Sequence, residues 1–352
     1  MDQISRIGMD TSKRIFQLHG VNSAEQPILR RKLSRSAMAT FFERLAPTVV
    51  AIEACGAAHH WARELSRLGH TVKLIAPQLA KPYVKRGKND AADAEALCEA
   101  MSRPTMRFVP VKTAEQQAAL MLAGERERLV RQRTQLANTI RGYAAEFGLV
   151  VAKGASHVAK LLEQLQADET VPALARALFA EQAADYARLQ ARIEATDARL
   201  LEWHLANALS QRLTKVPGIG PVIASLLVMK TPDPKAFRSG RDYAAWLGLT
   251  PKDHSTAGKV RLGGITRAGD ETLRSLLVVG ATAVVWQTRR GASRRPMPWL
   301  LKLMDRKPAK LCAVALANKT ARIAWKLMTT GGAYDSMPAK PVASASATLA
   351  AA

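Results

Sequence analysis

Four carboxylate residues in the N-terminal third of the chain stand where they could share one site. Asp10 ends the apolar run IGMD, and Glu53 ends the β-branched run VVAIE. Asp90 and Asp93 open KNDAADAEAL, which is typical of a helix start, and their spacing places both on one helix face. Because strand ends and a helix face can meet at the edge of an α/β sheet, we expect these side chains to converge.

A converging set of carboxylates favours a divalent metal ion. Close carboxylates repel one another unless cations neutralise them, and an all-oxygen environment suits Mg²⁺, with Mn²⁺ as an alternative. Two such ions roughly 4 Å apart stabilise both the attacking and the leaving oxygen of a phosphoryl transfer. Taken singly, each residue is more simply explained as a turn or as a helix cap favoured by the helix dipole. The metal hypothesis therefore depends on the whole set.

Three basic residues precede the acidic helix start. Lys85, Arg86 and Lys88 would suit a phosphate backbone that enters the same cleft. A solvated basic loop explains them equally well.

A second candidate centre lies in GLTPKDHSTAGKVRLGGITRAGDETLR, which follows Leu247. Its glycines predict a flexible loop from Thr250 to Gly264, and Ser255 is the only serine in that loop. A serine hydroxyl can attack a phosphodiester where cations stabilise the developing charge. Without other context, Ser255 would be explained as a turn residue and His254 as a surface histidine.

Other residues in the C-terminal half could contact nucleic acid. The same loop region supplies three cations as phosphate partners: Lys259, Arg261 and Arg267. Upstream, VPGIGPVIA resembles the hairpin of helix-hairpin-helix modules, in which Gly218 and Gly220 would let backbone amides approach a phosphate. The alternative is a plain glycine turn between packed helices.

The pattern of the first hundred or so residues predicts a mixed α/β fold. A meander of three strands is followed by strand–helix–strand units, with Ser36 as the expected cap of the first helix. The expected strands are Ile4–Asp10, Ile15–Val21, Ile28–Leu33, Thr48–Ala54 and Thr71–Ala76, and the expected helices are Ala37–Leu45 and Trp61–Leu68.

From Thr113 the pattern becomes helical. Thr113–Phe147 has no proline, and five apolar residues fall on one face of a long helix: Leu129, Leu136, Ile140, Tyr143 and Phe147. Leu174–Leu209 behaves similarly, so the pair predicts an antiparallel coiled-coil arm, with an ordinary helical bundle as the alternative. Further helices are expected at Asp242–Leu247, from Thr272 and at Lys310–Met328, and the Ala-, Ser- and Pro-rich tail is expected to be disordered.

Composition points to a polyanionic partner. Lys and Arg total 52 against 29 Asp and Glu, a net charge of +23, which favours nucleic acid. Three cysteines without CxxC spacing argue against disulfides and structural zinc. No apolar run suggests a membrane span or a signal peptide, so a cytoplasmic location is expected.

These motifs together resemble the bacterial insertion-sequence transposases with a DEDD motif, the IS110 family and its IS1111-like branch. The motifs stand in family order from IGMD to GDETLR, and the resemblance extends to about Met328. It implies an N-terminal RuvC or RNase H-like domain, a coiled-coil linker, and a mainly α C-terminal domain that carries the nucleophile. We place these domains at residues 1–112, 113–210 and 211–330, with a tail at 331–352.

The resemblance also implies a mechanism and partners. Asp10, Glu53, Asp90 and Asp93 would bind Mg²⁺, and Ser255 would form a transient 5′-phosphoserine link to DNA. A structured noncoding RNA from the element would guide a homo-oligomer, a dimer of dimers with composite centres, to double-stranded DNA at the bacterial nucleoid. In part of the family the loop is one residue longer, so direct counting reaches Thr256. Ser255 is preferred because its primary hydroxyl is less hindered.

Two other functions are consistent with the residues. A metal-dependent nuclease or Holliday-junction resolvase would use the carboxylates with water and need no serine. A non-catalytic nucleic-acid scaffold would explain the charge and the helical arm, but it would leave the four ordered carboxylates without a role.

Overall fold

The computed structural model describes residues 3–85, 90–154, 156–292 and 297–334. Its contacts divide the chain into two compact units, Met1–Ala119 and Leu120–Ala352. No helix in the described ranges is long and apolar enough to cross a bilayer. The tail expected to be disordered lies outside the described residues from residue 335 onward.

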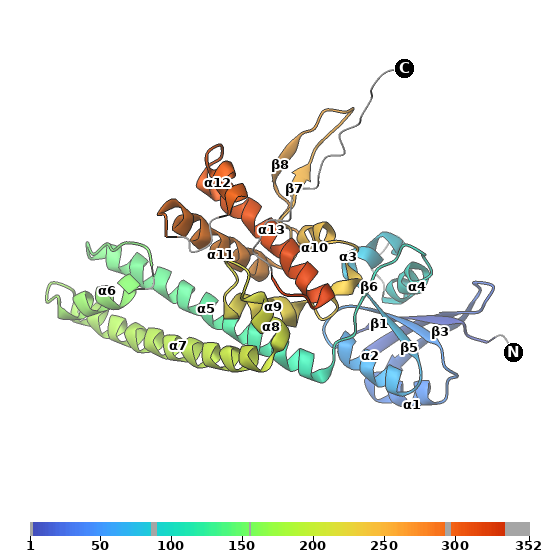
Figure 1. Ribbon diagram of the computed structural model, residues 1–352. Helices are drawn as coiled ribbons and strands as arrows, with labels where there is room; N and C mark the ends of the chain where they lie inside the picture. Colours follow the sequence, from blue (N-terminus) through green and yellow to red (C-terminus); the bar gives the residue numbers. More distant parts are fainter. Residues whose placement is uncertain (1–2, 86–89, 155, 293–296, 335–352) are drawn as a thin grey trace, which may run out of the picture. The chain divides into compact units, whose positions relative to one another are not determined.

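The first unit is built on a six-stranded mixed sheet in the order β3-β2-β1-β4-β5-β6 (Figure 1). Strands β1, β4 and β5 are parallel, whereas β2, β3 and β6 pair antiparallel to their neighbours. The short strand β6 was not expected from the sequence. The strands are β1 Arg6–Thr11, β2 Ile15–Val21, β3 Pro27–Ser34, β4 Val49–Glu53, β5 Thr71–Ile75 and β6 Phe108–Val109.

Helices cover both faces of this sheet. Ile7 and Met9 of β1 are fully buried on the face covered by α1 (Met38–Glu43) and α2 (Ala58–Arg67). The other face packs against α4 (Asp90–Ala100) through a smaller apolar cluster. Short turns of helix complete the unit: η1 Arg35–Ala37, α3 Pro77–Ala80 and η2 Lys81–Tyr83. The expected cap at Ser36 is wrong, because Ser36 lies inside η1 and Ala37 precedes α1.

Gly8 allows α4 to lie directly on β1. A Cβ atom there would stand 2.0 Å from the Ala94 carbonyl oxygen and 2.6 Å from the Cys98 amide nitrogen. Only a residue without a side chain permits this approach. Because Gly8 and Asp10 alternate onto the same face of β1, this contact brings the N-terminal end of α4 towards Asp10.

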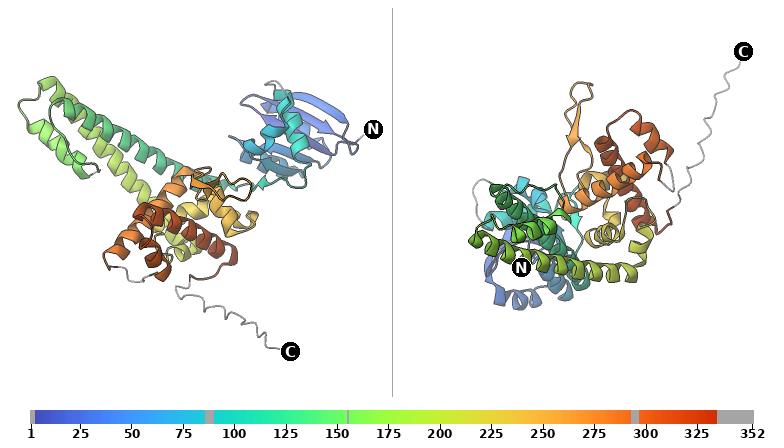
Figure 2. Two further views of the ribbon diagram at one scale, coloured as in Figure 1. Left: turned by 90° about the horizontal axis from the view of Figure 1, so that it is seen from above. Right: turned by 90° about the vertical axis from the view of Figure 1, so that its left-hand side faces the viewer.

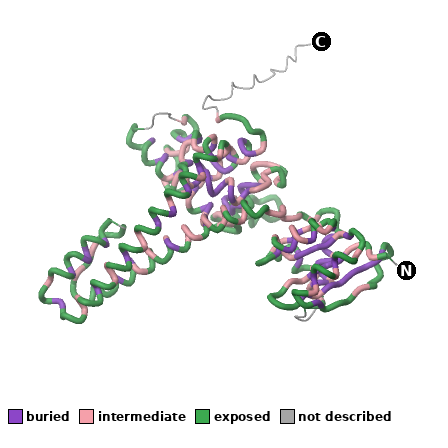
Figure 3. Tube along the Cα trace, turned by 90° about the horizontal axis from the view of Figure 1, so that it is seen from below, coloured by how far each residue is buried: buried purple, intermediate pink, exposed green. Residues whose placement is uncertain are grey.

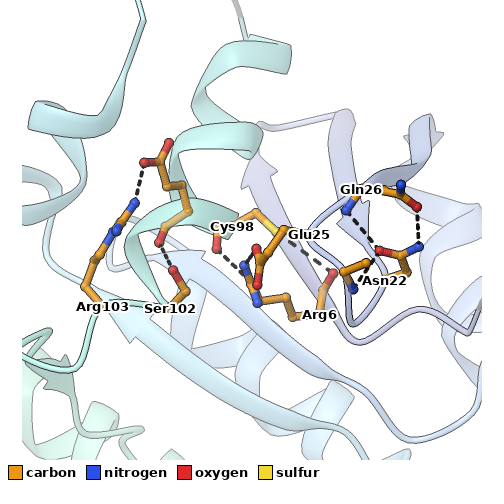
Figure 4. A network of polar contacts seen from close by, with 9 residues as sticks. Arg6, Asn22, Glu25, Gln26, Cys98, Ser102 and Arg103 are labelled. Carbon is orange, nitrogen blue, oxygen red and sulfur yellow. Dashed lines mark hydrogen bonds and ion pairs between the residues drawn. The ribbon is translucent and has the colours of Figure 1, made fainter.

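Arg6 fastens the C-terminal half of α4 to the same strand. Figure 4 shows its guanidinium between Glu25, with which it forms an ion pair, and the Cys98 carbonyl, to which Nε donates at 3.2 Å. Nearby, the Asn22 side chain shapes the β2–β3 turn by accepting the amide hydrogens of Ala24 and Gln26 at 3.0 and 2.9 Å. Of these contacts, the Arg6 bond to Cys98 helps to fix the position of α4 on the sheet.

Long helices dominate the first part of the second unit. In Figure 2, α5 (Ala114–Glu146) and α7 (Ala173–Ala206) run antiparallel, with α6 (Ser156–Ala167) at their far end. Polar contacts join the long helices: Arg126 donates to Asp197 at 2.5 Å, and Arg133 donates to Gln190 at 2.7 Å. The sequence did not predict α6, which buries four apolar side chains against α5 and α7.

The apolar face expected on α5 differs from the observed one. Leu129 and Ile140 are buried, whereas Tyr143 is 55 % exposed and Phe147 is 37 % exposed. Small residues take the inner positions instead, because Ala137 and Ala144 pack beneath α6. Much of the long helices' surface is exposed in Figure 3.

A helical bundle follows in the same unit. Its largest contact joins α11 (Glu271–Arg289) to α13 (Ala309–Thr330). The remaining elements are α8 Ala208–Leu213, α9 Pro221–Lys230, η3 Pro234–Ala236, α10 Gly240–Trp246 and α12 Pro298–Met304. The segment expected to be a free loop is instead a two-stranded hairpin of β7 (Pro251–Asp253) and β8 (Leu262–Ile265), which projects from the bundle in Figure 1. Its ends are held by backbone pairing and close glycine contacts.

Candidate functional site

Asp10 and Glu53 are placed together by neighbouring parallel strands. Met9 of β1 is in register with Ile52 of β4, so the next residues lie side by side at the carboxyl ends of both strands. Met9 and Ile52 face the core beneath α1 and α2. Because side chains alternate along a strand, Asp10 and Glu53 face the side covered by α4.

The first turn of α4 adds two more carboxylates. Oxygen atoms of Asp10, Asp90 and Asp93 all lie within 4.8 Å of one another. Asp10 and Asp93 are partly buried and Asp90 is exposed. Glu53 stands beside this group without belonging to it, although its charge and those of the aspartates affect one another. Three of the four predicted ligands are therefore at distances at which a single cation could contact them.

The electrostatics of the cluster favour a cation. Burial, followed by the charges of Asp93, Asp90 and Glu53, raises the pKa of Asp10 from 3.8 to about 6. Burial and the Asp93 charge also raise the pKa of Glu53. A divalent ion would remove the repulsion that adds to the effect of burial, and oxygen donors of this type suit Mg²⁺ or Mn²⁺.

The basic residues expected beside this cluster are only partly described. Lys85 is exposed and forms an ion pair with Glu95 on α4. Arg86 and Lys88 lie outside the described residues.

Ser255 lies near the tip of the β7–β8 hairpin. After it, Thr256 pairs with Lys259 around Ala257 and Gly258, both of which have positive φ angles of 46° and 79°. Two consecutive left-handed residues are typical of a type I′ hairpin turn. The Ser255 hydroxyl oxygen accepts the Arg261 amide hydrogen at 3.0 Å. The serine is thus exposed and oriented by the main chain.

Asp253 is a neighbour of the serine that the sequence reasoning missed. Its carboxylate accepts the Ser255 amide hydrogen at 2.9 Å. Hydrogen bonds from the Ser255 side chain and amide hold the pKa of Asp253 below its ordinary value. Aspartate two residues before a serine is a frequent turn pattern, which was the available signal.

The base of the hairpin is held by tight backbone contacts. A Cβ atom at Gly269 would stand 1.9 Å from the Trp246 carbonyl oxygen, and one at Gly248 would stand 2.7 Å from the Ala268 amide. Buried Arg274 donates to the carbonyl oxygens of Leu247 and Gly269 at 3.3 Å. The two ends of the hairpin are therefore joined at one place.

The predicted phosphate-contacting residues of this unit have different surroundings. Lys259, Arg261 and Arg267 are exposed. Gly218 packs against α11, where a Cβ atom at Gly280 would meet the Gly218 carbonyl oxygen at 2.0 Å. Gly220 has open space around it and precedes the first residue of α9.

Sequence models of two protein families match the chain. The model described as the transposase IS116/IS110/IS902 family matches residues 210–295, which include Ser255. A DEDD transposase model of the IS110 type matches residues 7–147, which include all four carboxylates.

Curated transposases are similar over nearly the whole chain. A putative transposase y4pF/y4sB of Sinorhizobium fredii is 67 % identical over 95 % of this chain and 86 % of its own length. The transposase for insertion sequence element IS1328 of Yersinia enterocolitica is 40 % identical over 95 % of this chain and 100 % of its own. The transposase for insertion sequence element IS1111A of Coxiella burnetii is 37 % identical over 95 % of this chain and 92 % of its own length.

Proposed function

Because the chain belongs to the IS116/IS110/IS902 family of transposases, we propose that two of its parts together cut and rejoin the DNA of an insertion sequence. These are the acidic cluster, made of the four carboxylates at the end of the sheet, and the serine hairpin, the β7–β8 hairpin that carries Ser255. The enzyme class follows from the family: a transposase cleaves DNA strands and joins them elsewhere. One observation carries the assignment of the chemistry to residues, namely the carboxylate oxygens of Asp10, Asp90 and Asp93 within 4.8 Å of one another.

The donor set fits a divalent metal ion. Asp10, Asp90 and Asp93 would hold it, with Glu53 completing the site. Burial and, after it, the neighbouring negative charges raise the pKa of Asp10, and a cation would neutralise those charges. Bound Mg²⁺ or Mn²⁺ would supply positive charge to the phosphodiester oxygens as the strand is cut. The mixed sheet that carries these residues supports the proposal of an RNase H or RuvC-like domain at residues 1–112.

Ser255 supplies the nucleophile in this proposal. Its Oγ forms a bond to phosphorus while the bond from phosphorus to the 3′ oxygen breaks, and the 3′ oxygen leaves as a hydroxyl. We assign Asp253, whose carboxylate accepts hydrogen bonds from the Ser255 amide and side chain, to take the serine proton, which then passes to the leaving 3′ oxygen. In the joining step a 3′ hydroxyl attacks the phosphoserine, and Ser255 is regenerated with its proton.

Basic and glycine residues would hold the nucleic acid. Phosphate contacts of this type set the position of the strand, not its sequence. The proposed contacts are Lys85, Arg86, Lys88, Lys259, Arg261 and Arg267, with Gly218 and Gly220 as a helix-hairpin-helix-like turn. Because Gly220 has open surroundings, Gly220→Ala tests the turn: DNA affinity falls if its amide contacts phosphate and stays unchanged otherwise.

Guidance and assembly complete the proposal. A structured RNA made from the element would direct the protein to double-stranded DNA at the bacterial nucleoid. Residues 113–210, with antiparallel α5 and α7, would act as a coiled-coil arm in a dimer or tetramer. Residues 211–330 would form the serine-bearing domain, followed by the tail.

Covalent trapping tests the serine chemistry. The protein is incubated with element-end DNA, flanking RNA and Mg²⁺, then denatured, and peptides linked to DNA are identified by mass spectrometry. We expect a 5′-phosphate on Ser255, with no adduct in Ser255→Ala and an unchanged adduct in the control Thr256→Ala. An adduct on Thr256 would move the nucleophile by one residue. Full-rate cleavage by Ser255→Ala would instead favour a water-using nuclease.

A further inference from the structure

A large groove runs along the second unit beside the serine hairpin. Its volume is about 1480 Å³, larger than the roughly 300–1,000 Å³ of small-molecule pockets. One side is formed by α13, and another by hairpin residues that include Pro251, Gly263 and Gly264. An extended occupant suits such a space better than a compact ligand.

The groove is strongly cationic. The described residues that line it include no carboxylate, and its cations are Arg241, Arg267, Lys310, Lys319, Arg322 and Lys326. Lys319, Arg322 and Lys326 stand three and four residues apart, so they share one face of α13. Like charges at this spacing repel one another. Within the described ranges, no carboxylate forms an ion pair with any of these three side chains to offset that repulsion. This charge is therefore available for an anionic partner.

An exposed aromatic ring accompanies the cations. Trp299 lines the groove, is 39 % exposed, and has the Lys319 ammonium 4.4 Å from its ring centroid. The other lining tryptophan, Trp325, is held in place by donating to the Pro234 carbonyl oxygen at 2.9 Å. A basic groove with an accessible aromatic ring is typical of surfaces that bind unpaired strands, because phosphates meet cations and a base stacks on the ring.

The groove continues into the serine hairpin. Gly263 presents bare backbone to it, and a Cβ atom there would stand 3.6 Å from the ring of His254, the residue before Ser255. From Pro251 to Ser255 an extended strand covers about 14 Å. A strand within a duplex advances about 3.4 Å per nucleotide and an unpaired strand can extend further, so Ser255 is at most about four nucleotides from the groove.

We propose that this groove binds a single strand of DNA on one side of the phosphodiester that Ser255 attacks, with a base stacked on Trp299. The inference rests on the proposed role of Ser255. DNA is the occupant we assign because the strand that becomes joined to Ser255 must continue past the hairpin, and the groove lies beside that path. Binding here would keep the cut strand unpaired and close to the serine until it is rejoined.

Binding measurements test the charge of the groove. Fluorescence anisotropy is measured with the full chain and a labelled 12-nucleotide DNA strand, about the length bound by one groove of this kind. We expect Lys310→Gln/Arg322→Gln/Lys326→Gln to bind at least tenfold more weakly, and its slope of log affinity against log salt to fall by about 2. The matched control Lys302→Gln/Arg306→Gln/Lys307→Gln removes the same charge from exposed residues outside the groove. Equal losses in both variants would overturn the proposal.

Variants of Trp299 test base stacking separately from charge. Trp299→Ala should weaken binding of the single strand roughly tenfold but leave binding of a DNA duplex unchanged, whereas Trp299→Phe should retain most of the affinity. Unchanged melting temperatures establish that the variants are folded. If an RNA strand of the same sequence depends on the groove and the DNA strand does not, the occupant is RNA and the assignment to DNA is wrong.

Crosslinking places the strand relative to the serine. DNA carrying 5-iodouracil at single positions on either side of the cut is irradiated with the full chain, and crosslinked peptides are mapped. Crosslinks to Trp299 from positions about three to six nucleotides from the cut support the proposal, and crosslinks only from distant positions overturn it. The anisotropy and trapping assays on the wild-type chain separate the two hypotheses: groove-dependent binding without any adduct on Ser255 would leave the groove in place and refute the nucleophile, and Ser255→Ala should bind the strand as the wild type does.

Discussion

At the scale of single residues, Asp10 carries the most informative electrostatics in the molecule. Its carboxyl group is partly buried among like charges, and its pKa of about 6 is above the ordinary 3.8. A carboxyl group with a raised pKa stabilises the fold below its unfolded value, and that contribution is lost as pH rises through about 6. At neutral pH without metal, the cluster is therefore a source of instability.

Replacing Asp10 with Asn should stabilise the metal-free protein. In EDTA at pH 8 we expect Asp10→Asn to raise the melting temperature by about 2–4 °C, the equivalent of roughly 1 kcal/mol after allowing for solvent screening. The difference should vanish towards pH 4, where the wild-type carboxyl is protonated as well. Glu43→Gln, at an exposed carboxylate of α1 outside the cluster, should have no such effect. Calorimetry across this pH range makes the comparison.

A divalent metal ion should reverse the order of stability between Asp10→Asn and the wild type. Adding Mg²⁺ or Mn²⁺ at pH 8 should raise the melting temperature of the wild type and leave Asp10→Asn nearly unchanged. Because a proton competes with the ion for Asp10, apparent metal affinity should fall up to tenfold per pH unit below about 6. An equal response of both proteins would contradict metal binding at this cluster.

At the scale of elements, the position of α4 on β1 determines whether the cluster exists. Gly8→Ala would push a methyl group into the backbone of α4, which costs about 1–3 kcal/mol or more and displaces Asp90 and Asp93. We expect a lower melting temperature and loss of the metal-induced rise. Gly142→Ala on α5 is the matched control, since open space surrounds it and alanine favours helices. Normal metal stabilisation of a folded Gly8→Ala would contradict this account.

The base of the serine hairpin allows a second test at this scale. Arg274→Met removes the donors to the Leu247 and Gly269 carbonyl oxygens but retains much of the side chain's bulk. We expect a fall of tenfold or more in Ser255 adduct formation, together with destabilisation of about 1–3 kcal/mol. Lys302→Met, at an exposed residue of α12, controls for loss of charge. An unchanged adduct yield would show that the hairpin orients its serine without this arginine.

The sequence pattern predicted some elements and contacts correctly and missed others, for physical reasons. The ends of β1 and β4 were visible because apolar runs stop at Asp10 and Glu53. The contact that matters most, Gly8 against Ala94, joins residues far apart in sequence and has no local signature. Likewise, the glycines after Leu247 predicted a flexible loop. In the structure, Gly248 and Gly269 instead permit close backbone contacts that hold a fixed hairpin. The apolar spacing correctly predicted that α5 is a long helix, but alanines occupy the inner positions where α6 packs.

At the scale of the whole molecule, the two chemical centres lie in separate compact units. The proposed assembly, in which one subunit would supply the carboxylates and another the serine, makes a clear prediction. Asp10→Asn and Ser255→Ala should each be inactive alone, but mixed subunits should regain activity because one composite centre then has both intact groups. Strand transfer by the mixture is the measurement, and each variant mixed with itself is the control. No recovery would mean that each subunit uses its own two centres.

The surroundings of Ser255 have a consequence for how such elements diversify. Its hydroxyl oxygen is held by the Arg261 amide, and a main-chain donor persists whatever side chain that position carries. Side chains around the hairpin tip can therefore differ between relatives without removing the donor that orients the proposed nucleophile.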